Sequence, residues 1–417
     1  MKEILKVVIA DQLSFLHYAE HFVEREIPQN LIDNPEILVI SGVRRCGKST
    51  LLQQIRKQRK EKDYYLNFDD DRLVNFSMND FQTLYELFIE LFGEQKTFYF
   101  DEIQNILGWE RFVRRLHDHG NKVFVTGSNA TMLSRELGSH LTGRFIRYEL
   151  YPFSFPEFLK FKGEKTISKN NHNSIERAKL KGAFNEYFSL GGFPVFLRIK
   201  EEDSLKYLFE SILYKDIMVR NKLTNERELL ELVYFLASNV AKLSSYNSLA
   251  KVIGVKNAST VKNYLSFFQD SYLTFQINKY DYSLKKQIQN PKKTYFIDNA
   301  LVKKLGFSFS ENTGRLLENL VFIELKRRKK TIFYHRDKGE CDFVIRDGFR
   351  ITEAIQVCSV FETSETKSRE ISGLLEALEA YSLEKGLILT IDTEESLSVN
   401  GKSIEIIPVW KWLMTIT

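Results

Sequence analysis

The residues with the clearest chemical meaning form one short segment, Ser41-Gly-Val-Arg-Arg-Cys-Gly-Lys-Ser-Thr50. From Gly42 to Ser49 it fits the pattern G-x-x-x-x-G-K-[ST], whose glycines let successive backbone N–H groups turn toward phosphate oxygens. Lys48 supplies a positive charge for the β- and γ-phosphates, and the Ser49 hydroxyl can bind Mg²⁺. We therefore predict a nucleoside triphosphate site built from Gly42, Val43, Arg44, Arg45, Cys46, Gly47, Lys48, Ser49 and Thr50.

A second segment, Thr97-Phe-Tyr-Phe-Asp-Glu102, is an apolar run that ends in paired carboxylates. Asp101 can bind the Mg²⁺ shell, directly or through water. Glu102 is placed to orient and deprotonate a water that attacks the γ-phosphate. The pair predicts hydrolysis of ATP rather than passive binding, with Lys48 and Glu102 as catalytic groups.

A third segment, Lys122-Val-Phe-Val-Thr-Gly-Ser-Asn129, is an apolar run ending in small polar residues. Ser128 or Asn129 could hold the attacking water or sense the γ-phosphate. An ordinary exit from a strand into a turn would look much the same, so both interpretations stay open.

Elements that position these groups can be read from the hydrophobic pattern. Ile37–Ile40 leads into the glycine-rich segment and Leu51–Ile55 follows at helical spacing, which is the strand–loop–helix context that the motif requires. Between 37 and 160 short apolar runs alternate with helical stretches, at Ile37–Ile40, Asp63–Phe68, Thr97–Phe100, Lys122–Thr126 and Phe145–Leu150. This alternation predicts an α/β fold, a parallel sheet with helices on both faces.

The chain has 417 residues, so we expect several domains. The predicted divisions are a helical lead-in (1–36), an ATPase core (37–160), a helical lid or linker (161–228), a winged-helix-like part (229–305) and a nuclease-like α/β part (306–417). No apolar run approaches the roughly 20 residues of a membrane span. Three scattered cysteines, Cys46, Cys341 and Cys358, argue against disulfides and zinc. A cytoplasmic location is therefore expected.

Four motifs resemble those of a family of prokaryotic AAA+ ATPases fused to a C-terminal domain of unknown function. They are Gly42–Ser49, Phe-Asp-Glu-Ile-Gln104, Thr-Gly-Ser-Asn129 and Leu-Tyr-Pro-Phe-Ser-Phe-Pro-Glu-Phe158; Gly191-Gly-Phe-Pro194 and Gly339-Glu-Cys-Asp-Phe343 also match. The resemblance implies a P-loop AAA+ core, a winged helix and a restriction-endonuclease-like end. It also implies that Arg144 could reach a neighbouring subunit's γ-phosphate, the alternative being an exposed structural arginine.

The segment 245–293 concentrates positive charge, with eight lysines, two aspartates and no Glu or Arg, whereas the whole chain has a net charge of +5. Asn257–Gln269 is predicted to be a recognition helix with Lys262 and Asn263 outward. We expect DNA binding through 245–293. A protein-docking module or a merely solvated lysine-rich loop are the alternatives.

The last part has the outline of a PD-(D/E)xK nuclease, with Glu318 in a helix and Asp342 in a strand. Where that pattern needs an acid and a lysine, this chain has Gln356 and Cys358. Gln is a weak ligand for Mg²⁺ and Cys a poor substitute for lysine. Glu340 shares a strand face with Asp342, which leaves a degenerate site of Glu318, Glu340, Asp342 and Gln356, and cleavage is not expected.

The sequence therefore predicts an ATPase that uses ATP and Mg²⁺ and passes the effect to a DNA-binding C-terminal half. A homo-oligomer or a protein partner would fit, and a membrane would not. Two alternatives remain, an ATP-regulated nuclease and a non-hydrolysing nucleotide switch that scaffolds proteins.

Overall fold

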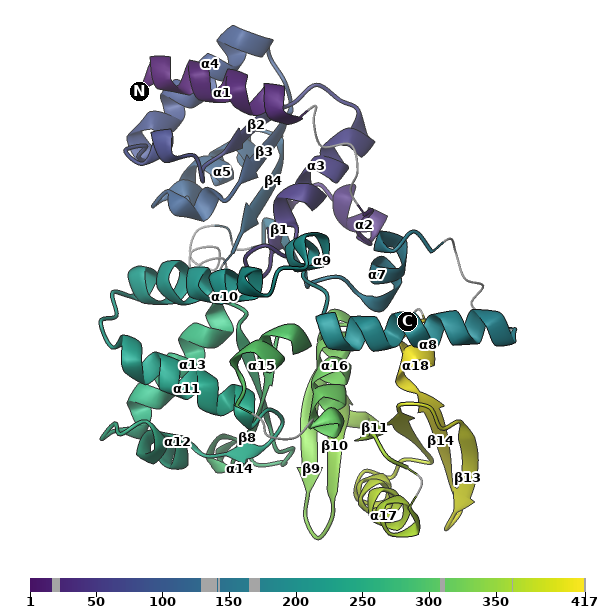
Figure 1. Cartoon of the computed structure of the whole chain (residues 1–417). Coiled ribbons are helices and arrows are strands. Elements are labelled where there is room, and N and C mark those ends of the chain that lie inside the picture. Colours follow the sequence, from purple (N-terminus) through teal and green to yellow (C-terminus); the bar gives the residue numbers. More distant parts are fainter. Residues whose placement is uncertain are drawn as a thin grey trace. The chain divides into compact units, whose positions relative to one another are not determined.

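The computed structural model describes residues 1–16, 23–128, 141, 143–164, 173–307, 312–361 and 363–415. The chain divides into two compact units (Figure 1). Unit 1 comprises Met1–Tyr151 and Asp270–Tyr272, and unit 2 comprises Pro152–Gln269 and Leu273–Thr417. Among the described residues, no helix combines the length and the apolar character needed to cross a bilayer.

Unit 1 is built on a five-stranded parallel sheet in the order β2-β3-β4-β1-β5. Its strands are β1 (Ile37–Ser41), β2 (Tyr64–Asn67), β3 (Thr97–Asp101), β4 (Lys122–Gly127) and β5 (Phe145–Glu149). Each agrees within one residue at either end with a run expected from the sequence. The strand inserted between β1 and β3 is β4, while β2 lies at the edge of the sheet.

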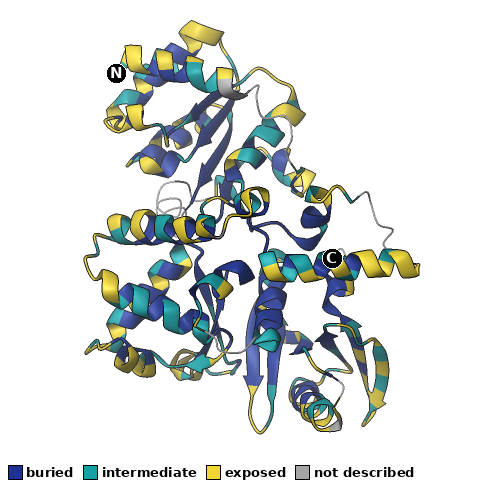
Figure 2. Ribbon diagram, viewed as in Figure 1, coloured by how far each residue is buried: buried dark blue, intermediate teal, exposed yellow. Residues whose placement is uncertain are grey.

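Helices cover this sheet because its central strands are apolar on both faces. β1 and β3 are buried along their whole length, which fits a parallel sheet that meets no water (Figure 2). The helical segments are α1 (Lys2–Leu16), α2 (Gln29–Ile32), α3 (Lys48–Arg59), α4 (Phe81–Phe92), α5 (Trp109–Asp118) and the short η1 (Asp71–Leu73), η2 (Met78–Asp80) and η3 (Ile103–Asn105).

Unit 2 begins with helices α7 (Phe155–Phe161), α8 (Ser174–Leu190), α9 (Pro194–Ile199), α10 (Glu202–Ser211) and the π-helical η4 (Ile212–Val219). Gly191-Gly192 separates α8 from α9 for a steric reason. A Cβ on Gly191 would lie 1.9 Å from Asp298 Oδ1, and one on Gly192 would lie 2.4 Å from the Phe153 carbonyl oxygen. The Gly192 N–H also donates to Asp298 Oδ2 at 2.7 Å, so this turn fits closely against its neighbours.

The next part of unit 2 carries a small sheet in the order β6-β8-β7. Its elements are α11 (Glu226–Ser238), β6 (Leu243–Ser244), α12 (Tyr246–Val252), α13 (Ala258–Asp270), β7 (Thr274–Asn278), α14 (Leu284–Gln289), β8 (Lys292–Phe296) and α15 (Asn299–Leu305). In α13, Val261, Leu265 and Phe268 are buried while Lys262 and Asn263 are exposed, as expected from the sequence.

The last part of unit 2 is a six-stranded mixed sheet in the order β13-β14-β12-β11-β10-β9. Its elements are α16 (Thr313–Arg327), β9 (Thr331–Arg336), β10 (Glu340–Asp347), β11 (Arg350–Cys358), α17 (Ser364–Ala380), β12 (Lys385–Thr390), β13 (Glu395–Val399), β14 (Lys402–Pro408) and α18 (Val409–Leu413). Ten consecutive residues of α16, from Leu316 to Leu325, are buried, so this helix is enclosed on all sides (Figure 2).

Candidate functional site

The glycine-rich segment forms a tight loop between β1 and α3. Arg45 (φ 62°) and Gly47 (φ 104°) both have left-handed backbone conformations, which curl the loop around the N-terminus of α3. The N–H groups of a helix's first turn have no partner within the helix, and the helix dipole adds positive potential there. The loop is thus suited to bind phosphate oxygens through its backbone.

The loop is also fixed from outside. The buried guanidinium of Arg25 donates to the carbonyls of Cys46 and Tyr151, both at 2.6 Å. A Cβ on Gly42 would lie only 2.2 Å from the Leu150 carbonyl oxygen, so a glycine is required there. Arg25 is not part of the motif, and its role could not be inferred from spacing alone.

Lys48 and Glu102 meet in this site. Lys48 Nζ lies 3.3 Å from Glu102 Oε1 and 3.3 Å from the Val43 carbonyl oxygen. Burial lowers the pKa of Lys48, but the charge and hydrogen bond of Glu102 together with other nearby negative groups raise the pKa above the ordinary value. Burial raises the pKa of Glu102, while the charges of Lys48 and Arg44 and the hydrogen bonds from Gln104 and Lys48 together bring it below its ordinary value. Both side chains are therefore charged at neutral pH, and a γ-phosphate would compete with Glu102 for Lys48.

Asp101 ends β3 in a fully buried position. Thr126 on β4 donates its hydroxyl to Asp101 Oδ1 and accepts the Glu102 N–H at 2.9 Å. Burial and the charge of Glu102 raise the pKa of Asp101 to about 6.

The other carboxylate oxygen, Asp101 Oδ2, is buried without a hydrogen-bond partner among the described residues. A buried, unpartnered carboxylate oxygen close to a hydroxyl is a donor set that suits Mg²⁺. Ser49 is close enough for its hydrogen bond to lower the pKa of Asp101. Ser49 and Asp101 therefore fit the metal role expected from the sequence.

Gln104 extends this network to the third segment. Its amide nitrogen Nε2 lies 2.6 Å from Glu102 Oε2 and 3.5 Å from Ser128 Oγ. Ser128 is buried and stands at the end of β4, next to β3, where the sequence places it. Asn129 lies outside the described residues. Sequence reasoning missed Gln104 and Thr126, although both follow an expected strand or lie near its end.

Arg144 lies beside the first residue of β1, at the opposite end of that strand from the phosphate loop. Its carbonyl accepts the N–H of Ile37, the first residue of β1, whereas the loop follows the last residue of that strand, Ser41. The strand spans roughly 16 Å, so Arg144 cannot reach the nucleotide of its own chain. Its side chain is paired with Asp118 at 2.8 Å and is 35% exposed.

The short segment Asp270–Tyr272, which follows α13, contributes to unit 1. The Tyr272 hydroxyl donates to Ser41 Oγ at 2.7 Å and accepts from Arg147 Nη2 at 2.5 Å. Tyr272 is buried and has a φ of 61°. The residue immediately before the phosphate loop is therefore bonded to a residue more than 200 positions later in the chain.

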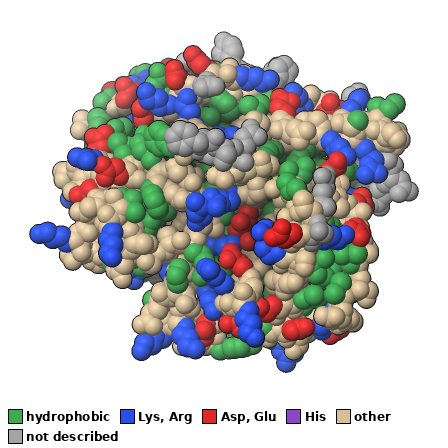
Figure 3. All heavy atoms as spheres, turned by 60° about the horizontal axis from the view of Figure 1, so that its bottom comes forward, with side chains coloured by type: hydrophobic (Ala, Val, Ile, Leu, Met, Phe, Trp, Pro, Cys, Tyr) green, Lys and Arg blue, Asp and Glu red, His purple; other side chains and the backbone are tan. Residues whose placement is uncertain are grey.

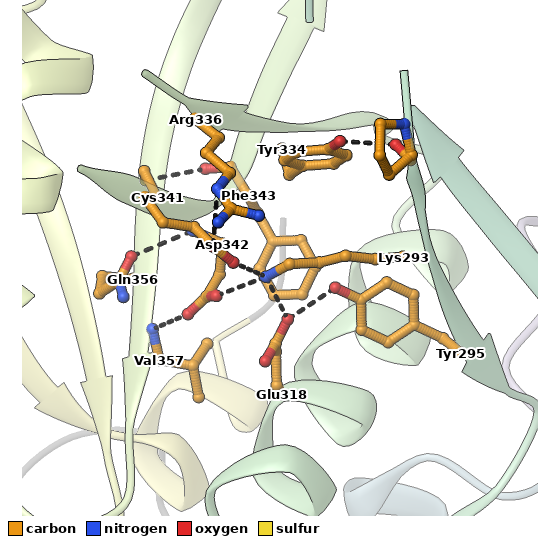
Figure 4. A network of polar contacts seen from close by, with 12 residues as sticks. Lys293, Tyr295, Glu318, Tyr334, Arg336, Cys341, Asp342, Phe343, Gln356 and Val357 are labelled. Carbon is orange, nitrogen blue, oxygen red and sulfur yellow. Dashed lines mark hydrogen bonds and ion pairs between the residues drawn. The ribbon is translucent and has the colours of Figure 1, made fainter. Parts of the chain in front are cut away.

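In unit 2 the four residues of the expected degenerate site come together (Figure 4). The N–H of Asp342 donates to Gln356 Oε1 at 3.0 Å, and Glu318, Glu340 and Asp342 converge on one point. That point is the ammonium of Lys293, which the sequence did not assign to this site. Glu353, which strand alternation places on the face of β11 opposite Gln356, is paired with Lys330 at 2.8 Å.

The predicted basic segment 245–293 is corrected in one respect. Lys292 and Lys293 are 8% and 2% exposed and so contribute little to the surface charge. Without these two lysines the segment has six lysines and two aspartates, so its net charge available for contacts at the surface is +4. Figure 3 shows that basic and acidic side chains intermingle over the face drawn there.

Comparison with known proteins adds the following. The family described as "AAA domain" matches residues 34–159, and a domain of unknown function (DUF8612) matches residues 181–312. Uncharacterized protein MJ1544 of Methanocaldococcus jannaschii is 36% identical, with 99% of this chain and 96% of that protein covered. An uncharacterized protein of Haemophilus influenzae is 32% identical, with 92% and 95% covered.

Among solved structures, a Walker-type ATPase of Pyrococcus abyssi is 15% identical, with 66% of this chain and 93% of that chain covered and a TM-score of 0.42. The AAA-domain match lies within unit 1 apart from its last eight residues. The coverage of the archaeal and bacterial relatives is nearly complete in both directions. The chain therefore belongs to the same family as these uncharacterized proteins, and its residues 34–159 match the AAA domain.

Proposed function

We propose that the chain hydrolyses ATP with Mg²⁺ and that Glu102 is the general base. The observation that carries this proposal is the arrangement around the loop, where Lys48, Glu102 and the unpartnered Asp101 Oδ2 face one small region. The chemistry that Mg²⁺ would supply here is positive charge against the phosphates. Ser49 and Asp101 would hold the ion, Lys48 would bind the β- and γ-phosphates, and Glu102 would take the proton from water.

Gln104 is proposed to position Glu102. Its Nε2 donates to Glu102 at 2.6 Å and to Ser128 at 3.5 Å, so a shift of Ser128 would be passed to the general base. The proposal is tested by phosphate release from ATP, with Mg²⁺ or with EDTA. We expect turnover with Mg²⁺ that Lys48→Ala abolishes, while the matched variant Lys57→Ala, in the last turn of α3, leaves it unchanged. Absence of turnover in the unaltered protein, with and without DNA, would contradict hydrolysis and favour a nucleotide switch.

We also propose that hydrolysis is coupled to DNA binding by unit 2. The order α11, β6, α12, α13, β7, β8, with a β6-β8-β7 sheet, is the order expected of a winged-helix module. The exposed face of α13 carries Ser259, Lys262 and Asn263, and Lys256 precedes the helix. Lysines contact phosphates and polar side chains can reach base edges.

Fluorescence anisotropy with duplex and single-stranded DNA tests this coupling. Lys256→Ala with Lys262→Ala should weaken binding roughly tenfold at 100 mM salt and reduce the salt dependence by about two phosphate contacts. Lys367→Ala, on α17, is the control. Equal DNA affinity in ATP, ADP and no nucleotide would contradict the coupling and leave ATP hydrolysis untouched.

A homo-oligomer completes the proposal. Arg144 lies too far from the nucleotide of its own chain, and we propose that it acts on the γ-phosphate bound by a neighbouring copy. Its pairing with Asp118 would then be exchanged for the phosphate when copies assemble.

A further inference from the structure

Lys293 lies at the centre of a cluster of acidic side chains in unit 2 (Figure 4). Its Nζ is 3.0 Å from Glu318 Oε1, 2.8 Å from Glu340 Oε1 and 2.8 Å from Asp342 Oδ1. The Lys293 ammonium donates hydrogen bonds to Glu318 and Asp342 and forms an ion pair with Glu340. The Lys293 side chain is only 2% exposed, whereas that of Glu340 is 37% exposed, so the contacts with Glu318 and Asp342 are the ones made away from bulk water.

The lysine reaches the cluster because of where β8 runs. Successive side chains of a strand point to opposite faces, so Lys292 and Lys293 diverge. Lys292 Nζ caps α14 by donating to the carbonyls of Ile288 at 3.1 Å and Gln287 at 3.3 Å. Lys293 points the other way, toward α16 and β10, which supply the carboxylates.

The remaining partners of the carboxylates are fixed donors. The Tyr295 hydroxyl donates to Glu318 Oε1 at 2.7 Å, and the Val357 N–H donates to Asp342 Oδ2 at 3.0 Å. Gln356 brings a neutral amide, whose oxygen accepts the Asp342 N–H and whose nitrogen donates to Glu370. The cluster thus resembles a cation site in which each ligand is oriented and an ammonium group stands at the centre.

A divalent cation bound between these three carboxylates would have to occupy the position of the Lys293 ammonium. Mg²⁺ and Ca²⁺ need six or more oxygen ligands, and a positive group 2.8–3.0 Å from all three carboxylates occupies that space and repels a second cation.

We propose that Lys293 is a permanent internal counter-ion that takes the place of a divalent cation between Glu318, Glu340 and Asp342. A cavity of about 860 Å³ adjoins the cluster, and its lining includes Arg315, Gln356, Ser359 and Arg369. On this proposal, a ligand would bind in that cavity without a divalent metal. The inference is independent of ATP hydrolysis, because it concerns only unit 2.

Mn²⁺ titration of the nucleotide-free full chain, followed by the electron paramagnetic resonance signal of free Mn²⁺, tests the proposal. The unaltered protein and Asp342→Asn should bind Mn²⁺ alike. Lys293→Ala should gain one site per chain, and the double variant Lys293→Ala/Asp342→Asn should lack it. Lys251→Ala, an exposed lysine on α12, is the matched control and should gain none.

Thermal unfolding gives a second readout. At 1 mM Mn²⁺ we expect the transition of Lys293→Ala to rise by roughly 5 °C or more, and that of the unaltered protein by less than about 1 °C. If Lys293→Ala does not fold, Lys293→Met keeps most of the side-chain volume and is titrated in its place. If neither Lys293→Ala nor Lys293→Met folds, the proposal is still tested by comparing Mn²⁺ binding of the unaltered protein with that of Asp342→Asn, which should be equal.

Two results would overturn the proposal. One is a Mn²⁺ site in the unaltered protein that Asp342→Asn removes. The other is a folded Lys293→Ala or Lys293→Met that gains no Mn²⁺ site. Cleavage of DNA in Mn²⁺ that both Asp342→Asn and Lys293→Ala abolish would likewise make the lysine a catalytic group beside a metal and refute its role as a replacement.

Discussion

Replacing Thr126 by valine should weaken the metal site while keeping the strand. Valine has nearly the same shape and the same preference for β-structure, so β4 itself should form. The change removes the hydrogen bond to Asp101 Oδ1 and the one accepted from the Glu102 N–H at 2.9 Å. Asp101 is fully buried, so the loss cannot be replaced by water without opening the site.

The expected magnitude follows from these two bonds. Leaving a buried polar group unsatisfied costs about 1–3 kcal/mol, which gives about 2–6 kcal/mol for the pair. For a domain of this size that lowers the melting temperature by roughly 5–20 °C. The Thr126 hydroxyl also lowers the pKa of Asp101, which is about 6. Removing it should raise that pKa by about one unit, which leaves about half of Asp101 protonated at pH 7, weakens Mg²⁺ binding about twofold there, and lets a pH near 8.5 restore it.

The assay is differential scanning calorimetry with and without Mg²⁺ and ATP, which identifies the transition of unit 1 as the one that these ligands shift. Phosphate release measured against Mg²⁺ concentration at pH 7 and pH 8.5 provides the functional readout. Thr126→Ser, which retains the hydroxyl, should stay close to the unaltered protein. If Thr126→Val melted and responded to Mg²⁺ like Thr126→Ser, the hydroxyl would have no part in holding Asp101 and Glu102.

Four further predictions follow from other contacts. Glu102→Gln should slow phosphate release by about 10²–10⁴-fold and tighten ATP binding about tenfold in calorimetric titration, because Lys48 loses its competing partner at 3.3 Å; unchanged affinity would contradict that competition. Arg144→Ala should lose about 10³-fold in turnover and regain activity when mixed with Lys48→Ala subunits, whereas a mixture that stays inactive would rule out action between copies. The stability of unit 2 should fall by up to about 3 kcal/mol as the pH rises from 4.5 to 7, because burial and Asp342 raise the pKa of Glu318 to about 7 and folding favours its protonated form; thermal unfolding of Glu318→Gln should lack this slope. Gly191→Ala should destabilise unit 2 by about 2–4 kcal/mol, since its φ is 69° and its Cβ would lie 1.9 Å from Asp298 Oδ1, while Gly182→Ala, with open space around it, should be neutral or slightly stabilising in the same thermal assay.

The phosphate loop could be predicted from sequence because its chemistry is local. Two glycines, a lysine and a serine at fixed spacing dictate one backbone path, and an apolar run on one side and a helical run on the other leave little freedom. The roles of Asp101 and Glu102 could be predicted for the same reason, because Asp101 is the last residue of β3 and Glu102 follows it directly. The roles of Thr126 and Gln104 could not, because they depend on which strands become neighbours, here β3 and β4.

Lys293 shows the limit most clearly. In the sequence it is one of eight lysines in a basic segment, with nothing to separate it from those that face solvent. Its role arises only when β8 places it against carboxylates that come 25 to 49 positions later. Gln356 and Cys358 indicate a departure from the nuclease pattern, but they could not show that a lysine from another strand lies among the carboxylates.

The turn Asp270–Tyr272 has a consequence for how the protein can be taken apart. Unit 1 is not continuous in the chain, since its Ser41 is bonded to Tyr272, which the polypeptide supplies only after α13 and before β7 of unit 2. A gene fragment ending at Tyr151 would encode an ATPase without that residue, and no single cut yields both units whole. If the chain after Tyr151 were replaced by a foreign domain in a simple fusion, unit 1 would lose Asp270–Tyr272. Both units are therefore complete only in the uncut chain.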